Sequence, residues 1–418
     1  MPSVRLLLVC CIALPLATAQ TLPPQTDPTG YHRNMIKTVL QEPAAQCNDG
    51  TRASFFYRNC TANADRARGD TTDYCLKGGP EGVSQNIWLL AFESAPGFCH
   101  DQSSCAARLP RLTSSNALPS TLFPGGALSV YPEENPNLYK ASTAFVPSCS
   151  SDLWLGANMS DQGVLFRGRL ILEAVLRSLT SGAMQHADVI VVSGGAGVMQ
   201  LFQTARIRAL LPPGAVLKVV CDDCLLLDAT PRVSVAEQPC SNDLDCPAAN
   251  ALPIGISRWN ASMPEGCFQG ACLLWPSDPM IQLLSSKSHF VFQHLFAESQ
   301  LRALRAWPLV LDAQNFSVQL SIALRSQLRD LQSDRVFAPS CGTEQGPVSF
   351  TNQRDFFKTL IATTNQYNVS GVVTFSSGVA DLVQGLSGSR AAIDNCTGFE
   401  CNRVDNGFRE ITRCGRIS

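Results

Sequence analysis

The chain has 418 residues, of which 45% are hydrophobic and 16% are charged, and its formal net charge is −2. This length is ample for one large packed core or two smaller ones. The balance of charges shows no basic excess, so the composition excludes the cationic surface that nucleic-acid binding requires.

Residues 1–19 have the three-part pattern of a secretory signal peptide. Arg5 supplies the positive charge, Leu6–Leu16 is an apolar run, and Ala17-Thr18-Ala19 is a small-residue cleavage site. The run is too short to span a bilayer as a mature helix, and no other segment reaches about 18 unbroken apolar residues. We therefore predict an extracellular protein that begins at Gln20 and has no transmembrane anchor.

The cysteine content also points to export. Cleavage of the signal peptide removes Cys10 and Cys11 from the 18 cysteines and leaves an even number, which indicates a disulfide framework in a secreted chain. Two pairs close in sequence are plausible bridges: Cys99 with Cys105, and Cys267 with Cys272. Cys221-Asp-Asp-Cys224 has the spacing of metal ligands, but no second such pair and no nearby histidine accompany it. We expect no metal and no cofactor.

The chain carries six N-x-S/T sequons, the acceptor sites for N-linked glycans on exported proteins. They are at Asn59, Asn158, Asn260, Asn315, Asn368 and Asn395. Together with the leader and the cysteines, they predict a disulfide-bonded glycoprotein.

The predicted elements alternate between strand and helix along the chain. Residues 20–46 form a flexible N-terminal segment, Pro-, Thr- and Gln-rich at first. Periodicity then predicts strands at 87–92, 143–146, 188–192 and 216–220, and helices at 164–179, 198–211 and 316–331. This alternation predicts an α/β protein with a mostly parallel sheet and helices on both faces. We expect one domain over 47–418, with a cysteine-containing surface insertion near 229–265.

A glycine-rich turn follows the strand predicted at 188–192. In the stretch Val189-Ile-Val-Val-Ser-Gly-Gly-Ala-Gly-Val-Met-Gln200, a β-branched run breaks into this turn and then into a helical pattern. An α/β hydrolase places the serine nucleophile of its G-x-S-x-G motif at such a strand–turn–helix junction. The middle position here is Gly195, which keeps the turn and lacks the nucleophile.

Five blocks resemble, in matching order, the Notum and pectin acetylesterase family of secreted carboxylesterases. They are Tyr131–Pro136, Cys149–Ala157, the helix that begins at Phe166-Arg-Gly, Phe292–Leu301 and Phe337–Cys341. The resemblance implies an α/β-hydrolase fold and a Ser-Asp-His triad with backbone oxyanion donors. It also implies an ester substrate, which is a fatty acyl ester on a Wnt protein for Notum and acetate on pectin for the plant relatives.

The chain departs from the family pattern at every catalytic position. Gly195 stands at the serine position, Ala297 at the aspartate position and Glu344 at the histidine position. The stretch that resembles the oxyanion loop is Phe92–Gly97, and its Pro96 has no N–H to donate. The resemblance therefore leads us to expect no catalytic residue at these positions.

The distribution of histidines leads to the same expectation. In this fold the base follows the serine and the acid along the chain, but the five histidines are His32, His100, His186, His289 and His294. None lies beyond position 294, so the base cannot come from its usual place. We interpret His289 and His294, at the end of a strand, as structural or surface residues.

Ser193 is the alternative nucleophile. It has Gly195 two residues on but Val191 two residues before, and a tight turn needs small residues on both sides of the serine. We expect Ser193 to end the strand with its hydroxyl bonded to the turn.

The sequence leaves three functions open. The first is a secreted pseudoenzyme that has lost ester hydrolysis. It keeps an apolar pocket that binds an acyl chain, or its surface binds a glycan or a protein, so its expected partner is a lipid-modified protein or a glycan. The second is an active carboxylesterase with a relocated site, using Ser193 with His294. The third is a structural or extracellular-matrix protein for which the pocket is irrelevant.

Overall fold

The computed structural model describes most of the chain between residues 34 and 412. The described ranges are 34–59, 86–93, 97–129, 131, 135, 138–159, 163–194, 204–237, 240, 246–263, 267–306, 311–331, 335–340, 360–364, 370–385, 392–393, 403–404 and 411–412. The predicted signal peptide, Gly195 and Glu344 lie outside them.

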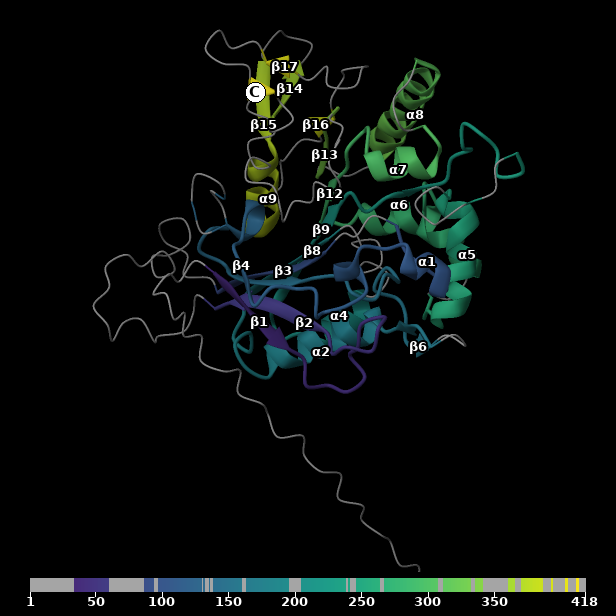
Figure 1. Ribbon diagram of the computed structural model, residues 1–418. Coiled ribbons are helices and arrows are strands. Elements are labelled where there is room, and N and C mark those ends of the chain that lie inside the picture. Colours follow the sequence, from purple (N-terminus) through teal and green to yellow (C-terminus); the bar gives the residue numbers. More distant parts are fainter. Residues whose placement is uncertain are drawn as a thin grey trace, which may run out of the picture.

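A ten-stranded sheet runs through the molecule (Figure 1), in the order β16-β13-β12-β9-β8-β3-β5-β2-β1-β4. Its strands are β1 Met35–Val39, β2 Ser54–Arg58, β3 Ile87–Phe92, β4 Thr121–Leu122, β5 Ser142–Val146, β8 Val189–Gly194, β9 Val216–Asp222, β12 His289–Phe292, β13 Val336–Ala338 and β16 Ala392–Ile393. Neighbours from β16 through β5 are parallel, whereas β5, β2, β1 and β4 pair antiparallel. The predicted mostly parallel sheet is confirmed.

Four two-stranded pairs lie outside this sheet. They are β6 Asn158–Met159 with β7 Leu165–Phe166, β10 Leu226–Leu227 with β11 Leu274–Trp275, β14 Leu360–Thr364 with β15 Ser370–Thr374, and β17 Arg403–Val404 with β18 Ile411–Thr412. The β10–β11 pair is parallel and the other three are antiparallel.

The helices cover both faces of the sheet, with α9 on the side opposite α2 and α4 (Figure 1). They are α1 Gln102–Ala106, α2 Gly168–Thr180, α4 Thr204–Leu210, α5 Ala248–Trp259, α6 Asp278–Leu284, α7 Glu298–Ala303, α8 Leu311–Asp330 and α9 Phe375–Gln384, with short 3-10 turns η2 Pro110–Leu112, η3 Gly126–Leu128 and η4 Phe268–Leu273. The helix predicted from residue 164 begins at Gly168, because Leu165–Phe166 pairs with β6.

Strand β8 shows why the sheet needs cover on both faces. Ile190 and Val192 lie in the apolar cluster that includes α2, α5 and α8. Val191, which points the other way, lies in the cluster that includes Val379 of α9. Successive strand residues point to opposite faces, so an unbroken β-branched run such as this one indicates a strand buried on both sides.

Helix α5 lies within residues 229–265, where the sequence predicts a surface insertion. Its inner face belongs to the core: Trp259 is fully buried, and its Nε1 donates to the carbonyl oxygen of Cys99 at 2.8 Å. The helix forms although Pro253 lies inside it. Tertiary packing outweighs the unfavourable local propensity here.

Five disulfides join described residues. Cys99 is joined to Cys105 and Cys267 to Cys272, the two pairs proposed from the sequence. The other three bridges are Cys47–Cys149, Cys221–Cys224 and Cys240–Cys246. Cys221-Asp-Asp-Cys224 is therefore a bridge in the structure. Cys47–Cys149 connects positions 102 residues apart in sequence, and a loop of that length is where a cross-link restricts the unfolded chain most.

The block Cys149–Ala157 is built around a buried carboxylate. Asp152 is 1% exposed and accepts hydrogen bonds from the backbone N–H of Gly168 and the hydroxyl of Ser150, both at 2.8 Å, and from the N–H of Trp154 at 3.2 Å. A Cβ added to Gly168 would lie 2.1 Å from its Oδ1. The glycine is required because the carboxylate approaches the first turn of α2 so closely.

Candidate functional site

The candidate site lies at the carboxyl edge of the parallel strands. Strands β3, β8, β9, β12 and β13 are parallel neighbours or joined through parallel neighbours, so their carboxyl ends meet at one edge. In open α/β sheets this edge is where ligands bind. Ser193, Asp223, His294 and Ala297 lie at or just beyond it.

Ser193 belongs to the sheet itself. It pairs with Ala91 on β3 and with Val220 on β9, and it is fully buried. Its Oγ has no hydrogen-bond partner among the described residues. Its burial keeps the hydroxyl away from a substrate at the strand end. The turn to which the sequence predicts it to bond lies outside the described residues. Residues 195–203, including Gly195 of the predicted turn, lie outside the described ranges.

Ala297 stands where the resemblance places the catalytic aspartate. It follows β12 and is the N-cap of α7, with φ −62° and ψ 116°, and it is 7% exposed. No side chain caps α7. A methyl group supplies neither the charge that orients a catalytic histidine nor the oxygen that normally caps a helix.

His294 and Asp223 form a pair across the ends of β12 and β9. His294 Nδ1 lies 2.5 Å from Asp223 Oδ2, and the backbone N–H of His294 donates to Asp223 Oδ1 at 2.7 Å. The imidazole is 5% exposed and packs edge-on against the ring of Phe292. The carboxylate fixes the orientation of the ring through Nδ1. His294 is thus a buried residue with a specific acidic partner.

The loop that carries Asp223 is constrained. Asp223 has φ +49°, a left-handed conformation that costs a non-glycine residue free energy. Its backbone N–H donates to the carbonyl oxygen of Phe292, and the Cys221–Cys224 disulfide spans it. Asp223 was not predicted from the sequence, because its partner is 71 residues away along the chain. The cysteines on either side of it, Cys221 and Cys224, were the only feature of the local sequence that pointed to this loop.

His289 has a different environment, at the beginning of β12. It is 4% exposed, and burial lowers the pKa of its imidazole to about 4, against a smaller opposing effect from a backbone hydrogen bond of Ser286. His289 is therefore neutral at physiological pH, and it lies at the amino end of the strand, away from the candidate edge.

Glu93 follows β3, in the stretch that resembles the oxyanion loop. It is 4% exposed, it pairs with Arg111, and its Oε2 accepts from the backbone N–H of Ser148 at 2.9 Å. These contacts tie the carboxylate to the neighbouring loops, so its role is structural. Pro96 lies outside the described residues.

Four of the six predicted glycosylation sites fall within the described ranges. Asn260 caps the end of α5 in a left-handed conformation and is exposed, and Asn315 is exposed on α8. Asn59 and Asn158 are partly buried, and Asn158 donates to the carbonyl oxygen of Arg258 at 3.2 Å. Asn368 and Asn395 lie outside these ranges.

No group of three His, Cys, Asp or Glu side chains in the described ranges is placed to hold a metal ion. Within the same part of the chain, no helix combines the length and apolar character needed to cross a bilayer.

The mostly parallel sheet and the helices on both of its faces are those of an α/β-hydrolase fold. A profile of the pectinacetylesterase family matches residues 67–242. Two crystal forms of the Wnt deacylase Notum from Drosophila superpose with TM-scores of 0.66 and 0.67, at 26% and 24% sequence identity. They cover 89% and 88% of this chain, and 99% and 98% of theirs.

Several similar proteins are named palmitoleoyl-protein carboxylesterases. The mouse protein NOTUM is 28% identical over 332 residues, which are 74% of this chain and 63% of the relative. The Xenopus laevis protein notum1 is 27% identical over 326 residues, 72% of this chain and 60% of the relative. The chain thus spans about three fifths of the length of these relatives. It is similar to members of the Notum and pectin acetylesterase family.

Proposed function

We propose that this protein is a family member that has lost serine-dependent ester hydrolysis. The observation that carries the proposal is Ala297, the one triad position inside the described residues. It is the N-cap residue of α7, and its methyl side chain makes no hydrogen bond. The sequence supports it, with Gly195 at the serine position, Glu344 at the histidine position and no histidine beyond 294. Without a nucleophile and a base that meet, no acyl-enzyme forms.

The test restores the triad on the same chain. We expect the mature wild-type protein to show no labelling by a fluorophosphonate and no hydrolysis of acetyl or octanoyl nitrophenyl esters above buffer. The triple variant Gly195→Ser/Ala297→Asp/Glu344→His is expected to gain about 10²- to 10⁴-fold in rate, the size of a general acid–base contribution. Labelling of the wild-type protein that a single serine substitution abolishes would contradict the proposal.

We further propose that the protein acts outside the cell as a binder of a lipid-modified protein or a glycan. The proposal is supported by the leader at residues 1–19, by the disulfides, and by relatives named palmitoleoyl-protein carboxylesterases. Sequencing the N-terminus of the protein secreted from cultured cells tests the cleavage before Gln20. Comparing a palmitoleoylated peptide with its unmodified form in fluorescence anisotropy tests the lipid ligand.

A second candidate function rests on the Asp223–His294 pair. A carboxylate that holds an imidazole through Nδ1 is the arrangement of a general base, and this pair lies at the edge where the family catalyses ester hydrolysis. The candidate is an esterase with a relocated site that uses Ser193. It requires saturable ester hydrolysis that Ser193→Ala and His294→Gln each abolish, whereas His289→Asn leaves it intact. The buried hydroxyl of Ser193 argues for the first proposal over this one.

A further inference from the structure

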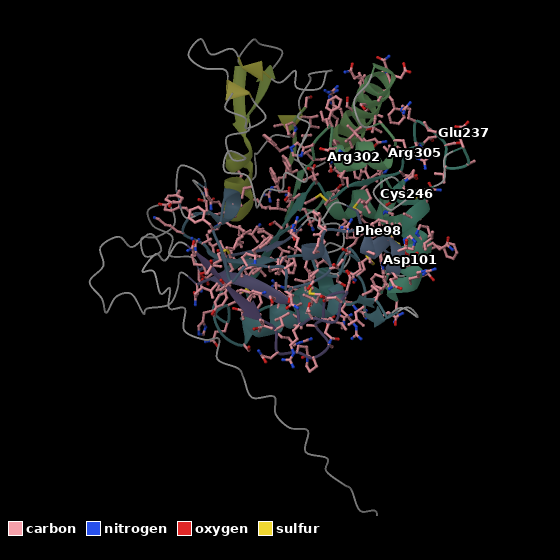
Figure 2. The ribbon with its side chains drawn as sticks, viewed as in Figure 1. Phe98, Asp101, Glu237, Cys246, Arg302 and Arg305 are labelled. Atoms are coloured by element: carbon pink, nitrogen blue, oxygen red, sulfur yellow. A yellow bond between two sulfur atoms is a disulfide. The ribbon has the colours of Figure 1, made fainter. Side chains whose placement is uncertain are left out.

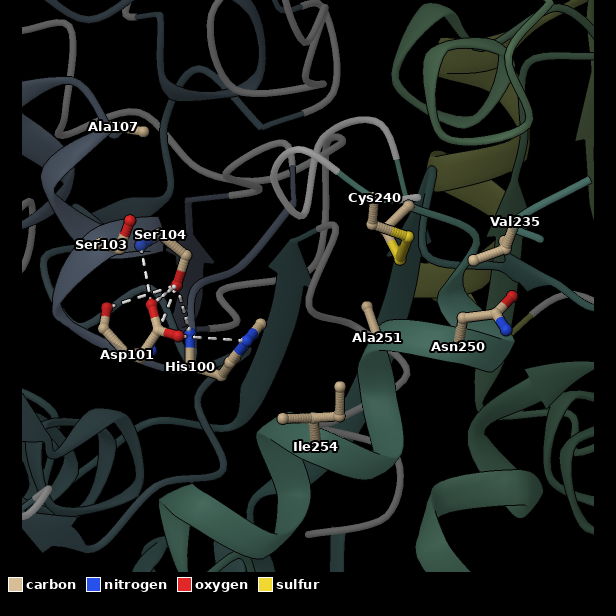
Figure 3. Close-up of a pocket in the computed structure, with 11 residues that line it drawn as sticks. His100, Asp101, Ser103, Ser104, Ala107, Val235, Cys240, Asn250, Ala251 and Ile254 are labelled. Carbon is tan, nitrogen blue, oxygen red and sulfur yellow. Dashed lines mark hydrogen bonds and ion pairs between the residues drawn. A yellow bond between two sulfur atoms is a disulfide. The ribbon is translucent and has the colours of Figure 1, made fainter. Parts of the chain in front are cut away.

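A cavity of about 570 Å³ lies between α1 and α5 (Figure 3). This volume falls within the range of about 300–1,000 Å³ that small-molecule sites occupy. Asp101 and Ser103 line one wall, and Asn250 and Ile254 of α5 line the other, beside Val235. The cavity is distinct from the candidate edge, because none of its lining residues belongs to the strand ends described above.

Both walls of the cavity are held in place. The Cys99–Cys105 disulfide closes the segment that carries Asp101, and the Cys240–Cys246 disulfide precedes α5. Trp259 at the end of α5 donates its Nε1 to the carbonyl oxygen of Cys99 and packs edge-on against Phe98 at 5.2 Å. Figure 2 shows Phe98, Asp101 and Cys246 on one flank of the molecule. A preformed cavity binds its ligand without the cost of ordering its walls.

The polar wall carries the carboxylate of Asp101, whose side chain is 27% exposed. Asp101 Oδ1 accepts from the backbone N–H and the hydroxyl of Ser104, both at 2.8 Å. Oδ2 lies 3.5 Å from His100 Nε2, longer than an ordinary charge-assisted hydrogen bond. Burial raises the pKa of the Asp101 carboxyl, but hydrogen bonds from Ser104, with His100 and Arg258 nearby, outweigh it and hold the pKa below its usual range. The group is therefore an anion at neutral pH.

The opposite wall is aliphatic. Ile254 is 45% exposed, and Ala251 and Val235 continue the apolar surface. No phenylalanine, tyrosine or tryptophan lines the cavity, which disfavours a quaternary ammonium ligand of the kind that aromatic cages hold. No lysine or arginine lines the cavity either. His100 is the one lining residue that could pair with an anionic ligand, and it already faces Asp101.

We propose that this cavity binds a primary ammonium group on an aliphatic chain, and that its occupant is a lysine side chain of a partner protein. An ammonium has three donors and no acceptor, and the Asp101 carboxylate and the Ser103 hydroxyl are acceptors on the same wall of the cavity. A lysine buries its methylene stem along apolar surface while its head stays in polar surroundings. Ile254 and Val235 provide that surface. The inference does not depend on the loss of catalysis.

Three probes with the same chain and different heads test the proposal: n-hexylammonium, 1-hexanol and hexanoate. The readout is the δ1-methyl NMR signal of Ile254 in the full mature chain, assigned with Ile254→Val. We expect saturable shifts from hexylammonium at concentrations about 2- to 5-fold lower than from hexanol, the factor that a partly exposed ion pair provides. Hexanoate is expected to give the weakest shifts.

Two variants separate the charge from the apolar wall. Asp101→Asn keeps a residue that caps α1 well and is expected to abolish the preference for hexylammonium over hexanol. Asp278→Asn, at the exposed start of α6, is the matched control and is expected to preserve it. Equal binding of hexylammonium and hexanol to the wild-type protein, or a preference that survives Asp101→Asn, would overturn the proposal.

A peptide tests the lysine itself. Acetyl-Gly-Lys-Gly-amide is expected to shift the Ile254 methyl signal, and the same peptide with an acetylated lysine is expected not to, because acetylation removes the charge. If hexylammonium binds and the lysine peptide does not, the cavity is an amine site and the assignment of a protein partner is wrong.

Discussion

Two helices that begin near the same sheet edge differ in how their first turns are satisfied. The N-terminus of α2 receives the carboxylate of Asp152, which accepts three hydrogen bonds and is 1% exposed. The N-terminus of α7 receives Ala297, whose side chain accepts none. Both positions lie in blocks that resemble the same family, yet only one retains an acid.

The difference between Asp152 and Ala297 lies in what an acid would do at each position. Asp152 satisfies backbone N–H groups that would otherwise be buried without partners, so its loss would cost folding free energy. The resemblance predicts that an acid at position 297 would serve a catalytic histidine, and it places Glu344 where that histidine would be. An unpaired buried charge is costly, so alanine is tolerated at 297 at the expense of a helix cap.

The largest expected effect is that of removing the Asp152 carboxylate. We expect Asp152→Ala to lower the free energy of unfolding by about 2–4 kcal/mol, because it leaves a cavity and several unsatisfied donors. Denaturant titration of the oxidised protein at pH 7 measures it. Asp152→Asn keeps the volume and one acceptor oxygen and is expected to cost less than half as much. Equal losses in the two variants would show that the hydrogen bonds to the carboxylate contribute little.

The pH dependence of stability provides a second test, because the pKa values of Asp152 and His289 are shifted in opposite directions. Burial raises the pKa of Asp152 from 3.8 to about 6, against the hydrogen bonds it accepts, so its contribution is greatest below pH 4 and is lost as the pH rises to about 6. Burial lowers the pKa of His289 from 6.5 to about 4, so its contribution is present above pH 6.5 and is lost as the pH falls to about 4. Each amounts to about 3 kcal/mol. The two oppose one another between pH 4 and 6.

Single substitutions at Asp152 and His289 are therefore expected to change the pH dependence of the free energy of unfolding in opposite directions. Relative to the wild-type protein, Asp152→Asn is expected to make stability rise more steeply with pH between 4 and 6, because only the His289 effect remains. His289→Asn is expected to make it fall with pH over the same interval. Unfolding titrations at half-unit pH steps measure both, and groups common to all variants cancel in the differences. Slopes of the same sign would contradict the assignment.

Local pattern was enough to predict four central strands of the sheet, β3, β5, β8 and β9. The apolar runs at 87–92, 188–192 and 216–220 became β3, β8 and β9, because strands buried on both faces need an unbroken apolar sequence. Helix α5 was not predicted, since Pro253 and the polar composition around it oppose a helix locally and the burial of Trp259 supplies the stabilisation. That burial depends on Cys99, 160 residues away.

The candidate site was predictable where it rests on single positions. Ala297 followed from the resemblance of its block, and the structure adds that it is a helix cap. The Asp223–His294 pair required β9 and β12 to be neighbours in the sheet, and one sequence does not specify which strands pair. The α1–α5 cavity was missed for the same reason, because its two walls are joined by tertiary contacts alone.

The smallest expected change in stability comes from giving α7 a capping side chain at position 297. Ala297 has the extended backbone of an N-cap residue, so Ala297→Ser is expected to raise the free energy of unfolding by about 1 kcal/mol by accepting a hydrogen bond from the first turn of α7. Gln300, at the N3 position, already donates its side chain to the carbonyl oxygen of Leu225 at 2.6 Å. Only the serine half of a capping box can therefore form. Ala303→Ser, at the other end of α7, is the matched control and should be neutral or slightly destabilising. If Ala297→Ser destabilises the protein by as much as it should stabilise it, the alanine is held by packing and the site has closed around it.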